Sequence, residues 1–155
     1  MRSMLKLPGW NAWISLGIVF AVGLAFGMAL TLPSEAAMQA PERTFPSGAA
    51  LMFNPINPAK AADFERVLGR LKAALDADPA RAEQSRGWKV YKSTEQVQGN
   101  IMYIFVLDPV QSGANYAVSV ILNDAFPTEV QALYEAFSGA YNGGQTAMNL
   151  ERVPF

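Results

Sequence analysis

The hydrophobic positions of this chain form one long uniform run followed by several short periodic segments. No residue between Lys6 and Glu35 is charged, and residues 12–32 are the strongly apolar part of that stretch. At 1.5 Å per residue, a helix over residues 12–32 is about 31 Å long, which matches the hydrocarbon core of a bilayer. The run therefore predicts a transmembrane helix at residues 12–32, preceded by an n-region at residues 1–11.

This segment is either a retained signal anchor or a cleavable signal peptide. Its length favours the anchor, because the apolar part of a secretory signal usually has only 7–15 residues. The small residues around Glu35, from Ser34 to Ala37, are typical of a cleavage site. Arg2 and Lys6 precede the run, so the positive-inside rule predicts a cytoplasmic N-terminus and an extracytoplasmic, periplasmic domain. Cleavage would instead give an exported soluble form.

Small residues recur on the predicted membrane helix at spacings of about one turn. Such a strip lets another helix, a flat pigment or a lipid approach the backbone closely. The alternative is that glycine and alanine are simply common in membrane segments and signal peptides. The residues that we expect to serve helix packing are Gly17, Ala21, Gly23, Ala25, Gly27 and Ala29.

Residues 33–47 predict an extended linker, because they contain three prolines and little apolar periodicity. The remaining residues, 48–155, are enough for one domain with a single core. Their periodicity predicts strands at residues 49–53, 88–93, 101–107 and 147–153. A helix is predicted after the Asn57-Pro58 cap, where apolar residues recur at i, i+3, i+4 and i+7 from Phe64. A further helical region is predicted from Val118 to Phe137, interrupted at Phe126-Pro127.

The resulting order, β-α-β-β-α-β, is that of a ferredoxin-like α+β domain, in which the first and third strands are central and the helices cover one face. In these two strands the residues that point to either face of the sheet are apolar, so the second face also needs cover. That cover is a second subunit, a ligand, another protein or the chain's own segments. The candidate residues for an interface or pocket on this second face are Met52, Phe53, Trp88, Tyr103 and Phe105.

The segment FNPINPAKAADFERVLGRL, residues 53–71, runs from a strand through Asn-Pro into a helix that carries Asp-Phe-Glu. It resembles the opening of dimeric α/β-barrel proteins, a superfamily that includes the antibiotic-biosynthesis monooxygenases. The resemblance extends over about residues 49–153. It implies two ferredoxin-like sheets paired face to face, which fits the doubly apolar central strands. Haem-degrading members rely on a histidine, so their activity is not implied for a chain that has none.

Composition excludes several kinds of chemistry. The chain has no histidine and no cysteine, which removes disulfides, Cys/His zinc sites, iron–sulfur clusters, His-ligated haem and the Ser-His-Asp triad. Its net charge is −1, with 12 basic and 13 acidic residues and no basic stripe for nucleic acid. Asp76 and Asp78 are better explained by helix termination and capping than by a cation site. We therefore assign no catalytic, cofactor-binding or metal-binding residue.

Two functions remain from the sequence. The first is a non-enzymatic, single-pass accessory subunit of a membrane complex, such as a respiratory or photosynthetic assembly, which docks its domain on partner subunits. The second is an exported dimeric α/β-barrel protein, a small-molecule binder or a cofactor-free enzyme, whose partner is a second copy of itself. The lack of any residue with clear catalytic chemistry favours the first.

Overall fold

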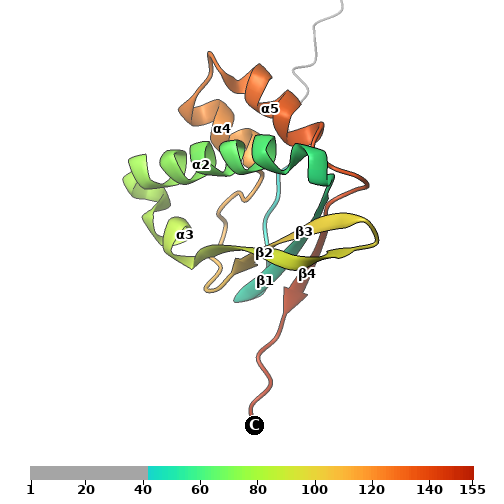
Figure 1. The fold of residues 1–155 in the computed structure, drawn as a ribbon. Coiled ribbons are helices and arrows are strands. Elements are labelled where there is room, and N and C mark those ends of the chain that lie inside the picture. Colours follow the sequence, from blue (N-terminus) through green and yellow to red (C-terminus); the bar gives the residue numbers. More distant parts are fainter. Residues whose placement is uncertain (1–41) are drawn as a thin grey trace, which may run out of the picture. The chain divides into compact units, whose positions relative to one another are not determined.

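The computed structural model describes residues 42–155 (Figure 1). Strands and helices follow the expected β-α-β-β-α-β order, with both helical regions divided into pieces. The elements are β1 (Ala49–Ile56), the 3₁₀ turn η2 (Pro58–Lys60), α2 (Ala61–Ala77), the 3₁₀ turn η3 (Pro79–Arg81), α3 (Ala82–Gly87), β2 (Trp88–Val97), β3 (Asn100–Leu107), α4 (Val118–Ala125), α5 (Val130–Ser138) and β4 (Thr146–Leu150).

The four strands form one antiparallel sheet in the order β2-β3-β1-β4, so the first and third strands are central, as expected. In the β1–β3 register, Met52 pairs with Phe105 and Phe53 pairs with Ile104. β2 and β3 form a hairpin whose turn residues, Gln98 and Gly99, both have positive φ. This is the geometry of a two-residue type I′ turn, which suits the twist of the two strands.

The first helical region begins where the sequence places it. The side chain of Asn57 accepts a hydrogen bond from the backbone N–H of Ala59 at 3.0 Å, and Pro58 opens the 3₁₀ turn that leads into α2. The apolar positions of α2 then face the sheet, with Phe64, Val67 and Leu71 buried. In Figure 1, α2, α4 and α5 all lie on the same side of the sheet.

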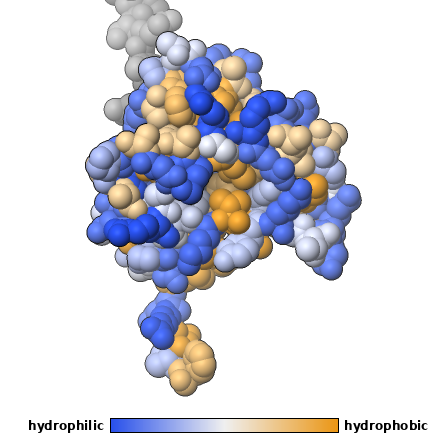
Figure 2. Space-filling model, turned by 60° about the vertical axis from the view of Figure 1, so that its left-hand side comes forward, coloured by the Kyte–Doolittle hydropathy of each residue, from blue (hydrophilic) through white to orange (hydrophobic). Residues whose placement is uncertain are grey.

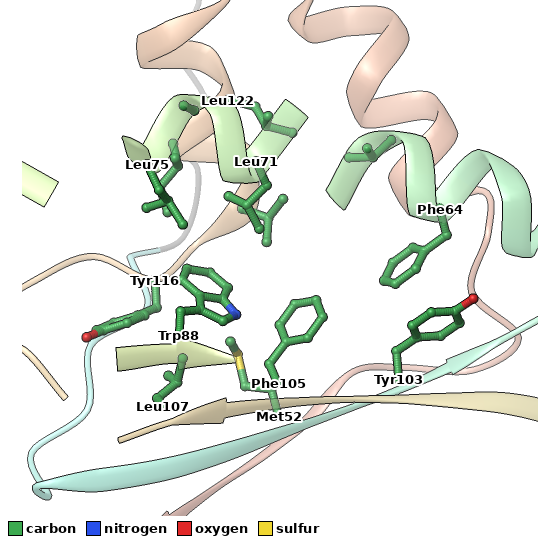
Figure 3. Close-up of a cluster of buried hydrophobic side chains, with 14 of the residues drawn as sticks. Met52, Phe64, Leu71, Leu75, Trp88, Tyr103, Phe105, Leu107, Tyr116 and Leu122 are labelled. Atoms are coloured by element: carbon green, nitrogen blue, oxygen red, sulfur yellow. The ribbon is translucent and has the colours of Figure 1, made fainter. Parts of the chain in front are cut away.

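Aromatic side chains fill the core between α2 and the sheet (Figure 3). The ring of Phe64 lies 4.9 Å from that of Tyr103 and stacks with Phe137 of α5 at 5.5 Å. Trp88 contacts Phe105 and Tyr116, with ring centroids 5.6 Å and 5.4 Å apart. The apolar face of α2 and every second side chain of the strands thus make a single layer of side chains.

Several boundaries differ from the sequence expectation. β1 continues to Ile56 and β2 to Val97, beyond the predicted ends at residues 53 and 93. β4 ends at Leu150, and residues 151–153, where the sequence predicts that the strand continues, are exposed and irregular. Within the expected linker, Phe45 is buried and its ring packs edge-on against Tyr116 at 5.6 Å. The backbone carbonyl of Arg43 accepts a hydrogen bond from the N–H of Tyr116, so residues 43–45 pack on the domain.

The predicted membrane helix at residues 12–32 and its strip of small residues lie outside the described residues. Within residues 42–155, no helix combines the length and the apolar character that crossing a bilayer requires.

Candidate functional site

Within residues 42–155, helices cover one face of the sheet and leave the other, which we call the open face, without helical cover. The open face carries apolar side chains from all four strands. Across the central strands Leu51 pairs with Val106 and Phe53 with Ile104, and cross-strand partners point to the same side. These residues are half-buried, and they are not among the partly buried side chains packed on the core.

The edge strands extend this apolar surface. Tyr91 of β2 pairs with Ile104 and is 57% exposed, while Met148 of β4 pairs with Leu51 and is 46% exposed. Within residues 42–155, the helices lie on the opposite side of the sheet (Figure 1). The expectation that the second face carries apolar residues without helical cover therefore holds for the described part of the chain.

The structure corrects the residues that the sequence assigned to this face. Of the five candidates only Phe53 lies on the open face. Met52, Trp88, Tyr103 and Phe105 are on the helix-covered face, where they are buried in the aromatic core (Figure 3). The strand registers bring these four together, but under α2.

The alternation of residues along β1 explains the correction. In β1 and β3 the odd-numbered and the even-numbered residues are both largely apolar, so alternation alone does not say which set meets the helices. The structure places Asn54 on the covered face with Met52, where its side chain is fully buried and hydrogen-bonded. Sequence reasoning did not use Asn54, although a polar residue in an apolar strand is a signal for a specific buried partner.

A polar group at the covered face consists of the buried Asn54 and the half-buried Tyr141 and Gln145, which we call the Asn54 cluster. Asn54 Oδ1 accepts hydrogen bonds from Tyr141 Oη at 2.8 Å and Gln145 Nε2 at 2.6 Å. Its Nδ2 donates to the carbonyl oxygens of Tyr103 at 2.9 Å and Met52 at 3.2 Å. Both donors and both acceptor sites of the amide are therefore used, so the cluster holds the segment before β4 on the sheet.

Burial raises the pKa of the Tyr141 hydroxyl far above its usual value, and the hydrogen bond from Gln145 and the charge of Arg43 only partly oppose this. The hydroxyl thus stays protonated and acts as a donor at neutral pH. Nothing in this geometry activates it as a base.

A second polar group joins α2 to β2. Glu65 Oε1 accepts hydrogen bonds from Lys92 Nζ at 2.8 Å and from Tyr103 Oη at 2.7 Å. The hydrogen bond from Lys92, and next that from Tyr103, lowers the pKa of Glu65, while burial is the main cause that raises the pKa of Tyr103. These three residues fix the helix to the sheet edge, and the side chains of Glu65 and Lys92 are both about half exposed.

Acidic residues of the helical regions, including the two weighed as a cation site, have structural partners. Asp78 accepts from the N–H of Ala80 and caps η3, which confirms the capping interpretation. Asp76 pairs with Lys72, and Asp124 forms an ion pair with Arg81 at 2.7 Å. In residues 42–155 no three acidic side chains gather as a metal site would require.

A hollow of about 790 Å³ lies where β1 begins and β4 ends. Its charged lining residues, Asp108, Glu151 and Arg152, are all exposed. A shallow depression of this kind does not provide the enclosed, convergent groups of a typical small-molecule site. The open face is therefore the candidate functional surface.

Comparison with known proteins gives one solved structure. It is described as an antibiotic biosynthesis monooxygenase from Caulobacter crescentus CB15, with 20% identity, a TM-score of 0.40, and coverage of 68% of this chain and 89% of that one. No family model and no curated protein matches the chain. The match is to the kind of protein that the sequence resembles, but the similarity is weak and says nothing about the activity of this chain.

Proposed function

We propose that this chain is a non-enzymatic accessory subunit of a membrane protein complex, and that its open face docks on a partner subunit. The observation that carries the proposal is the continuous apolar surface formed by Leu51, Phe53, Ile104 and Val106 at the centre of a sheet, with Tyr91 and Met148 beside it. Large apolar patches on one side of a domain are typical of interaction sites.

The size of the open face supports a tethered interaction. Four strands about 4.8 Å apart and five to ten residues long give a flat footprint of roughly 300–650 Å². Stable interfaces bury about 800 Å² per partner. At about 25 cal/mol per Å² of buried apolar surface, the open face contributes roughly 10 kcal/mol to the free energy of binding. The freedom that two partners lose on association costs about 4–15 kcal/mol, which largely offsets this gain.

A second attachment removes much of that cost. Two contacts on the same partner act together, because the first raises the effective concentration of the second. The apolar residues 12–32 and their small-residue strip would supply such a contact within the bilayer. This combination favours a membrane-complex subunit over a freely diffusing binding protein, for which the open face alone is marginal.

The test is the migration of the full chain, extracted from membranes in mild detergent, on native gels. We expect the wild-type chain to migrate with other subunits in one large species. Phe53→Glu, which places a charge at the centre of the open face, should release it. Tyr134→Glu adds the same charge at an exposed position of α5 and should leave migration unchanged.

Three results would contradict the proposal. One is a wild-type chain that migrates alone, and another is a chain found cleaved and freely soluble. The third is migration at twice the mass of the chain with no other protein present, which would favour the paired-sheet alternative.

A further inference from the structure

A narrow crevice lies between α2 and β2, on the helix-covered side of the sheet. Its walls are Leu68, Leu71 and Leu75 of α2 and Trp88 and Val90 of β2, with Ser85 of α3 at one end. Figure 2 looks from the side that carries α3 and the end of α2, and it shows a recessed apolar patch bordered by hydrophilic residues. We call this feature the α2–β2 crevice.

The indole N–H of Trp88 has no hydrogen-bond partner within residues 42–155. Trp88 is only 8% exposed, and its Nε1 is buried without an acceptor in reach. In Figure 3 this nitrogen points into the space between Leu71 and Phe105. Buried donors are paired in the great majority of proteins, and an unpaired one costs more than an ordinary hydrogen bond gains. Trp88 Nε1 is therefore a buried donor for which residues 42–155 present no acceptor.

The polar groups at the edge of the crevice are already in use. Lys72 pairs with Asp76, and Ser85 Oγ donates to the other oxygen of Asp76 at 2.7 Å. The hydrogen bond from Lys72, followed by that from Ser85, lowers the pKa of Asp76, which keeps this carboxylate charged and occupied. Among the lining residues, Trp88 carries the buried donor without a partner, and its surround is apolar, which favours a neutral ligand with one acceptor.

The dimensions limit how much of such a ligand enters. The crevice measures about 40 Å³, and a water molecule needs about 10–15 Å³ on the same kind of measure. It therefore accepts about three heavy atoms, such as a methyl group and a carbonyl. Val90 is 41% exposed at the outer wall, so it offers apolar surface to the rest of the molecule.

We propose that the α2–β2 crevice binds the end of a small, neutral, apolar molecule, with a carbonyl oxygen of that molecule accepting a hydrogen bond from Trp88 Nε1. The crevice lies on the face opposite to the open face. Its occupancy is therefore independent of the docking function proposed above.

The probes are 2-hexanone and 2-methyl-1-hexene, which have nearly the same shape but differ in the acceptor. The full chain, labelled with ¹⁵N-tryptophan and reconstituted in lipid nanodiscs, gives three indole resonances, and loss of one in Trp88→Phe assigns Trp88. We expect 2-hexanone to move the Trp88 indole proton downfield, and 2-methyl-1-hexene to leave it in place. At equal free concentration the ketone should bind about fivefold more tightly, as one net hydrogen bond allows.

Two variants complete the test. Trp88→Phe keeps an aromatic ring and should reduce the ketone preference to about one, read from leucine and valine methyl resonances. Val90→Phe narrows the crevice from an exposed position, where folding is not at risk, and should abolish the response to both probes. Tyr91→Phe, on the opposite face of β2, should change neither.

The proposal is overturned if 2-hexanone leaves the Trp88 resonance unmoved up to its solubility limit. It is also overturned if Trp88→Phe keeps the preference for the ketone, or if Val90→Phe responds like the wild type. Transfer of magnetisation from bound water to the indole proton, undiminished by 2-hexanone, would show that the crevice holds water alone.

Discussion

Replacing Asn54 by aspartate isolates the contribution of the buried amide. Aspartate has the same shape, so the packing around the Asn54 cluster is preserved. Its carboxylate can still accept from Tyr141 and Gln145, but it has no Nδ2 to donate to the carbonyls of Tyr103 and Met52. Asn54→Asp therefore removes two donors and adds a charge at a site with no exposure to solvent.

The expected destabilisation has a part that depends on pH and a part that does not. At low pH the protonated carboxyl donates to one of the two carbonyls, so one hydrogen bond is lost, at about 1–3 kcal/mol. Burial and the facing carbonyls raise the pKa of the folded-state carboxyl above its unfolded value of about 3.9. The folded state then binds more protons than the unfolded state, so stability is highest below about pH 4 and is lost as pH rises toward the folded pKa.

The part that depends on pH follows from how far the folded-state pKa rises. Each tenfold rise in the proton affinity of the folded-state carboxyl lowers the stability of the folded protein by about 1.4 kcal/mol once the group is charged. The charge of Arg43, which lowers the pKa of Tyr141, would also stabilise the new carboxylate, so we expect its proton affinity to rise about a hundredfold and no more. The total destabilisation at pH 7 is then about 4–6 kcal/mol, a large part of the stability of a domain of this size.

Urea unfolding of the full chain at pH 4 and pH 7, followed by circular dichroism, measures both parts. Asn149→Asp is the matched control, because Asn149 lies on β4 of the same sheet but is exposed. We expect a large loss for Asn54→Asp that grows with pH, and almost none for Asn149→Asp. A loss for Asn54→Asp that is equal at the two pH values would refute the assignment of Asn54 as a buried, fully paired amide.

Two further predictions concern packing and charge. Gly87→Ala should destabilise the domain by about 1–3 kcal/mol, because a Cβ there would lie 2.2 Å from the carbonyl oxygen of Pro109. Gly69→Ala should instead stabilise the domain by about 0.5–1 kcal/mol in the same urea titration, because Gly69 lies within helix α2 and a Cβ there would meet no atom within 4 Å. Glu65→Gln should lower the urea midpoint modestly at pH 7 and progressively less as the pH falls below 4.5. The pKa of Glu65 is held down chiefly by Lys92, so its contribution is present above the carboxyl's usual pKa of 4.5 and is lost as pH falls through the lowered value. A pH-independent effect would contradict this pairing.

The order and type of the elements could be predicted because they depend on local chemistry. The Asn57 cap, the spacing of Phe64, Val67 and Leu71, and the Gln98-Gly99 turn act within a few residues of chain. Each has a physical mechanism that does not need the tertiary structure. The sheet order followed from the element order, because few topologies suit a split β-α-β pair.

The faces of the sheet could not be assigned in the same way. Alternation separates two sets of residues in β1 and β3, but when both sets are apolar it does not say which set meets the helices. The buried Asn54 decides this, and its partners Tyr141 and Gln145 are 87 and 91 residues further along the chain. The unpaired Trp88 Nε1 is likewise a property of the packed core, and no local pattern indicates it.

The central claim is that a partner covers the open face in the assembled membrane complex. Hydroxyl-radical labelling of native membranes, compared with the chain released by denaturant and refolded in detergent, tests this directly by mass spectrometry. Tyr91 and Met148 report on the open face, and Tyr134, 50% exposed on α5, is the internal control. We expect oxidation of Tyr91 and Met148 to be several-fold lower in the membrane than in the released chain, with Tyr134 unchanged. Equal oxidation of Tyr91 and Met148 in the two samples would contradict the claim.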